Sequence, residues 1–281
     1  MPHAIPTLPT HVATRYAVPL REGGSLPAVV DTEEGGLYVV KFRGAGQGEK
    51  ALVAELIVGL LATRLGLPMP ELALVDVDTA FGRTEPDPEI QELLRRSHGL
   101  NVGLRYLDGA FNYDPRVAEG LVPAELAADV VWLDALVSNV DRTPRNPNLL
   151  IWERIAWLID HGAALYFHHD WATADDARAL RPSPGIADHV LLPLAGDPLA
   201  ADQRLAGRLD AAILEGILAQ VPDDLLLPPG EPPPPGLPTP AAVRAAYVRH
   251  LALRLDTPRA FAADAAERWR ALQPATRGRQ P

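Results

Sequence analysis

Strand-forming and helix-forming segments are unevenly distributed along the chain. Segments rich in β-branched and aromatic residues, which favour strands, lie in the first part at 15–20, 26–32, 37–43, 72–78 and 101–107. Between them, apolar residues repeat with helical spacing at 51–65, where Gly66 provides a stop, and 82–98 should be a loop with a short helix. From Pro123 onward the helical pattern dominates. Helices are expected at 124–139, 198–220, 240–256 and 258–273, with two short strands at 148–153 and 155–160.

This distribution predicts an α+β protein of two lobes. We expect a β-rich N-terminal lobe at residues 1–107, with a sheet and one long helix, and a mainly helical C-terminal lobe at residues 108–281. A cleft is expected between the lobes. The proline-rich segment 230–240 should be a surface connection, because too little chain follows it to fold independently.

The composition excludes several classes of function. The net charge of −10 argues against nonspecific binding to nucleic acid, which requires a surplus of basic residues. The absence of cysteine excludes disulfides, thiolate catalysis and cysteine-ligated zinc. The N-terminus lacks the pattern of a signal peptide, and no apolar run approaches the ~18 residues of a membrane span. We therefore expect a cytoplasmic protein that binds neither nucleic acid nor a membrane.

Two acidic residues and an asparagine form the most informative motif. Asp141 and Asn146 lie in the segment DRTPRN, and Asp160 begins the segment DHG after two apolar strands. In phosphoryl transfer an Asp can orient and deprotonate the attacking hydroxyl, while Asn and Asp oxygens bind magnesium. The spacing therefore predicts a kinase with Asp141 as base and Asn146 and Asp160 as magnesium ligands, with Gly162 allowing a sharp turn. The alternative is an ordinary turn, because Asp, Asn, Thr and Pro all favour turns.

A lysine at the end of an apolar strand could contact the phosphates of a bound nucleotide. Lys41 ends the strand VVKF, and Glu55 lies among apolar residues on the following helix. An ion pair between them would fix the position of the ammonium group. The alternative is that Lys41 is a surface lysine and Glu55 a solvated helix residue.

The turn Gly23-Gly24-Ser25 could also contact phosphate. Glycine has no Cβ, so backbone N–H groups there could approach phosphate oxygens, although such a turn is more often a simple hairpin. The Walker pattern and GxGxxG are both absent, which disfavours P-loop and Rossmann sites.

A group of histidines follows Asp160 in the sequence. The group consists of His161, His168, His169 and Asp170. It lacks the helical spacing of a zinc site, so we expect a loop beyond the metal site that could line the substrate entrance. Ser183 lies in the same expected loop region, 163–190, and is a candidate phosphorylation site there.

Four segments resemble the HipA-like kinases, which belong to the wider protein-kinase-like and phosphatidylinositol-kinase-like fold. They are VVKF at 39–42, AELIVGLLATRLGLPMP at 54–70, SNVDRTPRNPNLL at 138–150 and WLIDHGAALYFHH at 157–169, within a resemblance that covers about 15–195. The resemblance implies a bilobal kinase that binds ATP and Mg²⁺. It implies the roles Lys41 for phosphate, Glu55 for its anchor, Asp141 for the base, and Asn146 and Asp160 for magnesium. It also implies that RYLDG is a hinge, where backbone groups of Arg105, Tyr106 and Leu107 would meet adenine.

The resemblance implies transfer of the γ-phosphoryl group of ATP to a hydroxyl, with protein Ser or Thr as the preferred acceptor. The alternatives are a small-molecule kinase, similar to aminoglycoside or choline kinases, and a nucleotide-binding pseudokinase. The chain has Asp-His-Gly instead of Asp-Phe-Gly and lacks His-Arg-Asp, departures shared with atypical families. It is also shorter than the HipA toxins, so a toxin role and an antitoxin-like partner stay open.

Overall fold

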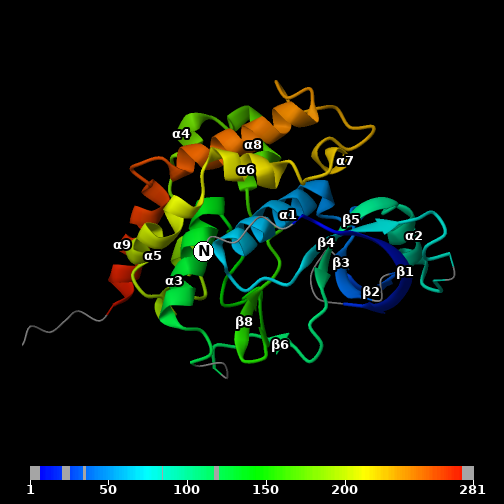
Figure 1. Cartoon of the computed structure of the whole chain (residues 1–281), viewed down its shortest axis with the longest axis horizontal. Coiled ribbons are helices and arrows are strands. Elements are labelled where there is room, and N and C mark those ends of the chain that lie inside the picture. The colour runs from blue at the N-terminus through cyan, green and yellow to red at the C-terminus, as the bar shows by residue number, and fades with distance from the viewer. Residues whose placement is uncertain (1–6, 21–25, 34–35, 84, 117–119, 274–281) are drawn as a thin grey trace, which may run out of the picture.

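The computed structural model describes residues 7–20, 26–33, 36–83, 85–116 and 120–273. The N-terminal part of the chain is rich in strands and the later part is mainly helical (Figure 1), which confirms the α+β prediction. No helix within these ranges is both long enough and apolar enough to cross a membrane.

The N-terminal strands close into a five-stranded barrel in the order β1, β2, β3, β5, β4. The strands are β1 (Thr10–Pro19), β2 (Ala28–Thr32), β3 (Leu37–Lys41), β4 (Leu72–Val77) and β5 (Gly99–Arg105). Closure arises because β1 pairs antiparallel with β2 along one edge and parallel with β4 along the other. All five predicted strands form, and β1 begins at Thr10 rather than at residue 15.

Alternate side chains of the strands fill the barrel. Val30 and Val40, for example, point inward and have no exposed surface. Helix α2 (Pro88–Arg95), the short helix expected within 82–98, adds Leu94 to this cluster. The barrel therefore has a hydrophobic core of its own.

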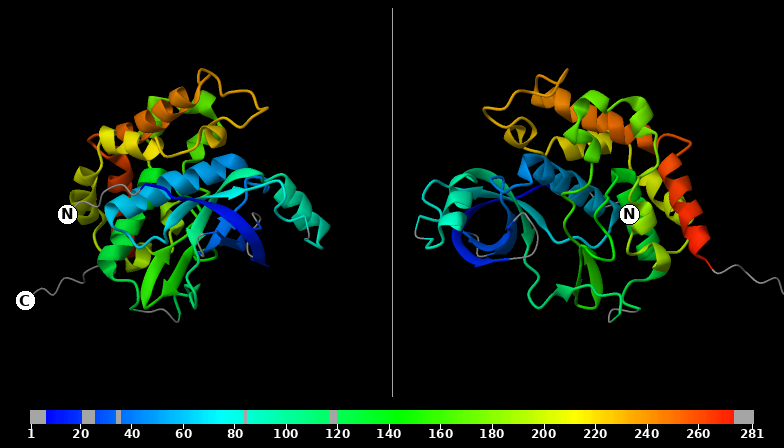
Figure 2. Two further views of the ribbon diagram at one scale, coloured as in Figure 1. Left: turned by 45° about the vertical axis from the view of Figure 1, so that its right-hand side comes forward. Right: turned by 180° about the vertical axis from the view of Figure 1, so that it is seen from behind.

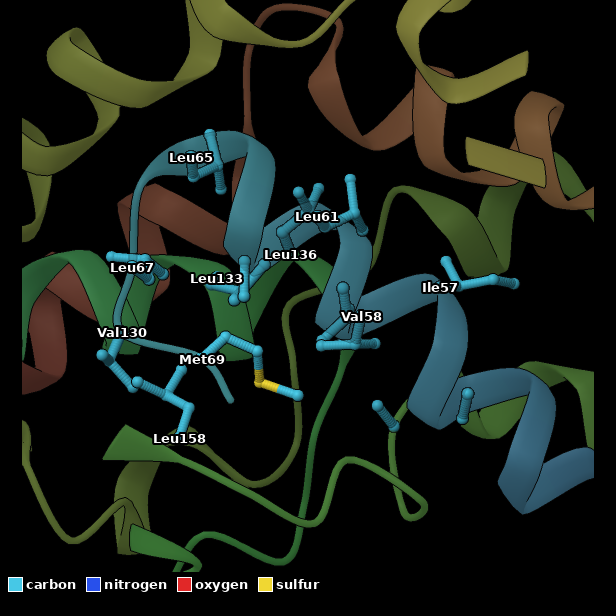
Figure 3. Packing of buried hydrophobic residues seen from close by; sticks show 14 of the residues in the cluster. Ile57, Val58, Leu61, Leu65, Leu67, Met69, Val130, Leu133, Leu136 and Leu158 are labelled. Carbon is cyan, nitrogen blue, oxygen red and sulfur yellow. The ribbon is translucent and has the colours of Figure 1, made fainter. Parts of the chain in front are cut away.

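Helix α1 (Gly48–Leu65) runs between the barrel and the C-terminal helices (Figure 1). Every residue from Ala51 to Ala62 is buried, as expected of a helix that is apolar on all sides. Figure 3 shows its leucine and valine side chains packed against those of α3 (Ala124–Val137). The helix ends at Gly66 in the left-handed conformation, with φ of 80°, which confirms the predicted stop.

The C-terminal part is mainly helical, and its later helices pack partly on α3 and partly on one another (Figure 2). These helices are α4 (Asp176–Ala179), α5 (Pro198–Leu205), α6 (Ala211–Leu218), α7 (Asp223–Leu226), α8 (Pro240–Leu255) and α9 (Ala260–Leu272). Helices α8 and α9 match the predictions for 240–256 and 258–273. The proline-rich segment 230–240 connects α7 to α8 and is mostly exposed, as expected.

The prediction of one helix at 198–220 is wrong, because the chain leaves helical geometry between α5 and α6. Asp210 has an extended backbone, and its side chain accepts the Ile213 N–H at 2.8 Å, so it caps a new helix. Leu205, Leu209 and Ile213 keep the spacing of one apolar helix face across this break, which conceals it.

A second sheet of three strands positions the loop that carries Asp141 and the turn that carries Asp160. It consists of β6 (Phe111–Asn112), β7 (Leu149–Trp152) and β8 (Ile155–Leu158), in that order. Strands β7 and β8 were predicted, whereas β6, only two residues long, was not. The loop between α3 and β7 carries Asp141, and the turn after β8 carries Asp160.

Candidate active site

A cleft of about 1030 Å³ lies between the barrel and the second sheet. Its lining includes Val39, Lys41 and Leu104 from the barrel and Asp141, Asn146 and Asp160 from the opposite loops. The volume suits a ligand of nucleotide size. Residues that are distant in the sequence are thus brought into one cavity.

Lys41 is the central cation of the cleft. It is 7% exposed, and its Nζ lies 2.7 Å from Glu55 Oε2 and 2.7 Å from Asp160 Oδ1. Burial alone would lower the pKa of Lys41, but the two carboxylates outweigh burial and raise it. Lys41 therefore stays charged, and an ion triad joins β3, α1 and the turn after β8. Its burial excludes the alternative of a surface lysine.

Glu55 is fully buried in α1. Its Oε2 accepts a second hydrogen bond, from the His161 backbone N–H at 2.7 Å, while Oε1 has no partner among the described residues. Burying a carboxylate costs free energy unless it is paired, and Lys41 provides the pair. Glu55 is therefore not a solvated helix residue, and it links the lysine strand to the Asp160 turn.

The Asp141 loop begins directly after α3. That helix ends at Ser138 in the left-handed conformation, and Asn139 Oδ1 accepts the Asp141 N–H at 3.1 Å. The Asp141 Oδ2 in turn accepts from Asn146 Nδ2 at 2.6 Å and from Asn148 Nδ2 at 3.3 Å. Within the described chain no group donates to the other oxygen, Oδ1, which is thus available to a substrate hydroxyl.

The Asp160 turn differs from the prediction. Asp160 itself has the left-handed φ of 55°, which Asp tolerates better than most residues, whereas the φ of Gly162 is not positive. A Cβ at Gly162 would lie 3.4 Å from Ala51 Cβ, an ordinary contact, so the turn does not require glycine there. Burial alone would raise the pKa of Asp160, but Lys41 outweighs burial and lowers it.

Asn146 and Asp160 offer the oxygen donors that magnesium prefers. Asn146 uses Nδ2 for Asp141, and Asp160 uses Oδ1 for Lys41, so within the described part of the chain one oxygen of each side chain is left for a cation. Magnesium usually binds one or two protein oxygens together with water and substrate phosphate, and this donor set fits that mode. The described residues contain no group of three His, Asp or Glu side chains that could hold a metal alone.

The expected hinge borders the cleft. Its first two amides are used within the protein, because Arg105 N donates to Glu71 O and Tyr106 N donates to Leu37 O, both at 2.8 Å. The Leu107 N–H has no such partner in the part of the chain that the structure describes, and Leu107 lines the cleft. Among the described residues, the Leu107 amide is the one of these three without a protein acceptor, so it is left for a ligand.

Gly23, Gly24 and Ser25 lie outside the described residues. The residues on either side of that segment, Leu20 and Pro27, line the cleft, and the Leu20 N–H donates to Pro27 O at 2.8 Å. The phosphate-binding role of the segment therefore stays a prediction.

Two of the four residues expected at the substrate entrance are buried instead. His161 and His168 have no exposed surface, whereas His169 and Asp170 are exposed. His161 Nδ1 lies 3.2 Å from Arg142 Nη2 and must accept, because arginine only donates. Burial lowers the pKa of His161 to about 4, so this histidine is a neutral core residue.

Burial also changes the interpretation of two other residues. Ser183 is 1% exposed, so the prediction of an accessible phosphorylation site is wrong. Asp134 in α3 was not predicted from the sequence to have a role. It is fully buried, and its Oδ2 lies 2.5 Å from Arg142 Nε. The signal was an acidic residue inside the apolar segment VVWLDALV, where a buried charge requires a partner.

Comparisons with known proteins agree with the resemblance noted in the sequence. A family model described as HipA-like kinase matches residues 15–179. Five chains of solved structures are similar. One is the crystal structure of a Helicobacter pylori proinflammatory kinase, CtkA, with a TM-score of 0.56 and 14% identity, covering 95% of this chain and 99% of that chain. At this identity the likeness shows the fold alone. A search of curated proteins found no match.

Proposed function

The chain belongs to the HipA-like kinase family, and we propose that it transfers the γ-phosphoryl group of ATP to a hydroxyl group. The observation that carries this proposal is the ion triad of Lys41, Glu55 and Asp160, in one cleft with Asp141 and Asn146. Phosphoryl transfer is catalysed mainly by positioning and by electrostatic stabilisation, and this cleft concentrates groups suited to both.

Lys41 is proposed to bind phosphate oxygens. Its ammonium group has three N–H donors, of which Glu55 and Asp160 use two. The third is left for a phosphate. Because two carboxylates already hold the ammonium group, Lys41 is oriented before the nucleotide binds.

Asp141 is proposed as the catalytic base. The two asparagine donors at Oδ2 restrict rotation of the carboxylate and leave Oδ1 for the proton of the acceptor hydroxyl. Asn146 and Asp160 would hold Mg²⁺, which when bound neutralises charge on the phosphates. The side chains proposed to act on the phosphates thus belong to the triad or to the Asp141 loop.

The hinge amide is proposed to recognise the base. Val39 and Leu104 pair across β3 and β5 and line the cleft, so adenine can lie against apolar side chains. The Leu107 N–H would then donate to a ring nitrogen of adenine. We propose that this segment also separates the two lobes of a protein-kinase-like fold, 1–107 and 108–281.

The acceptor is proposed to be Ser or Thr of a protein. The segment after Asp160 supports this proposal, because it presents exposed side chains, including Tyr166 at 59%. Such a surface is accessible to an extended peptide.

Magnesium-dependent transfer from γ-labelled ATP tests the proposal. We expect label on protein with the wild type and a rate lower by a factor of about 10²–10⁴ in Asp141→Asn, with ATP affinity nearly unchanged. Asp188→Asn, at an exposed position outside the cleft, is the matched control. Comparable turnover in Asp141→Asn would contradict the role of Asp141. Label released only as free phosphate would mean transfer to water, and the search for the acceptor would then turn to small molecules. ATP binding without turnover would favour a pseudokinase.

A further inference from the structure

Asp134 is a buried carboxylate that takes no part in the proposed reaction. Its hydrogen-bond network reaches both the Asp141 loop and the Asp160 turn. Its Oδ1 accepts from Asn139 Nδ2 at 3.0 Å. Its Oδ2 accepts from Arg142 Nε at 2.5 Å and from His189 Nε2 at 3.0 Å. His189 Nδ1 accepts the Leu191 N–H, so the proton of this histidine is on Nε2, which faces Asp134. Both oxygens of the carboxylate therefore act as acceptors.

Arg142 extends this network to the Asp160 turn. Its Nη1 donates to the backbone carbonyls of Asn148 and Ile159, and its Nη2 donates to His161 Nδ1 at 3.2 Å. Ile159 and His161 are the two neighbours of Asp160 in the chain. The guanidinium group is fully buried, and its planar set of donors fixes these positions relative to one another.

Asn139 extends the same network to Asp141. Its Nδ2 donates to Asp134, and its Oδ1 accepts the Asp141 N–H at 3.1 Å. The amide of Asn139 cannot be reversed without losing both bonds, because the carboxylate only accepts and the N–H only donates. Asp134 thus determines which atom of Asn139 faces Asp141.

We infer that Asp134 is a positioning residue that sets Asp141 and Asp160 relative to each other; this inference rests on the proposed function. As long as Asn is the partner at position 139, this role requires a carboxylate at position 134. An amide in place of Asp134 has only one oxygen for these two sides. With that oxygen facing Arg142 and His189, which both donate, its NH2 group would face Asn139 Nδ2, which is also a donor. Asn139 would have to turn, and the Asp141 N–H would lose its acceptor.

An exchange of amide and carboxylate between positions 134 and 139 tests the inference. Asp134→Asn alone breaks the alternation of donors and acceptors, because two donors then face each other. In the double variant Asp134→Asn/Asn139→Asp, the carboxylate at position 139 accepts from the amide at position 134 and from the Asp141 N–H. The negative charge also stays close to Arg142. Asp129→Asn is the matched control, since Asp129 lies on the same helix and pairs with Arg204 at 2.5 Å.

We expect kcat of Asp134→Asn to fall about 10²-fold, the effect of displacing a catalytic group by about 1 Å, with little change in the KM for ATP. The double variant should recover most of this loss, and Asp129→Asn should keep wild-type kcat. Hydrogen exchange at the Asp141 amide gives a readout independent of activity. That amide should be protected in the wild type and the double variant and exchange faster in the single variant.

Several results would overturn the inference. One is a wild-type kcat in Asp134→Asn. Another is a folded double variant that recovers neither kcat nor the protection of the Asp141 amide. The third is a decrease in kcat that is fully explained by the fraction of Asp134→Asn that is unfolded. If the single variant does not fold, the test rests on kcat and on hydrogen exchange at the Asp141 amide in the double variant. If the wild type transfers no phosphate, the proposed function fails, and amide exchange still tests the positioning of Asp141.

Discussion

Replacing Glu55 with glutamine keeps the size of the side chain but removes one charge from the ion triad. Glu55 Oε2 accepts two hydrogen bonds of 2.7 Å, from Lys41 Nζ and from the His161 N–H. Hydrogen bonds to charged groups contribute about 1.5–3 kcal/mol, against about 0.5–1.5 kcal/mol between neutral groups. Lys41 keeps a charged partner in Asp160. We therefore expect the interactions of residue 55 with Lys41 and the His161 N–H to weaken by about 2 kcal/mol in total. A loss of this size lowers kcat/KM for ATP about 30-fold.

Steady-state kinetics of Glu55→Gln beside Glu49→Gln measure this effect. Glu49 lies on the same helix, and its only ion pair in the described structure is with Arg43 at 3.4 Å. Its replacement should change kcat/KM by about fivefold or less, because weak ion pairs contribute about 0–1 kcal/mol. Thermal unfolding of both variants monitors the fold. A fully folded Glu55→Gln enzyme with the kcat/KM of Glu49→Gln would refute the triad as the basis of phosphate binding.

Three further predictions concern pH, metal and packing. Burial lowers the pKa of His161 from about 6.5 to about 4, so the unfolded chain binds this proton first and stability falls as pH drops below 6.5. At pH 5 the loss from His161 is about 2 kcal/mol, and His161→Asn should show a smaller decrease between pH 7 and 5 in denaturant titrations. Asp160→Ala should weaken ATP binding more with magnesium than without it; calorimetry giving equal weakening would contradict metal ligation. Leu61→Ala, at a fully buried position, should lower the free energy of unfolding by about 2–5 kcal/mol, whereas Leu180→Ala, at a position 48% exposed, should change it little.

The strands and long helices could be predicted because their signals are local. The apolar pattern of α1 and the stop at Gly66 are examples. Barrel closure could not be predicted, because it depends on parallel pairing between Thr10 and Leu74, which no local pattern specifies. The two residues of β6 are too few to give a period, and the break at Asp210 is concealed by apolar residues on both sides.

The predicted site residues that line one cavity could be selected from the sequence because their chemistry is distinctive at each position. An acid after an apolar strand, as at Asp160, also occurs in ordinary turns, and the prediction came from its combination with Asp141 and Asn146. Histidine is ambiguous, since it is polar enough for a surface and small enough for a core. The burial of His161 depends on Arg142 and on Met69, whose sulfur lies 3.4 Å from its Nε2. Those partners are distant in the sequence, so the pattern alone could not place His161.

The complete burial of α1 has a consequence for how the enzyme becomes active. A helix with one solvated face can rotate or slide at small cost, but moving the Ala51–Ala62 segment would expose apolar surface wherever it went. We therefore expect the contact between Glu55 and Lys41 to form when the protein folds and not in a later rearrangement. Molecules in solution should then divide into two populations, folded with the triad assembled or unfolded without it. Heat should abolish activity and structure along the same curve.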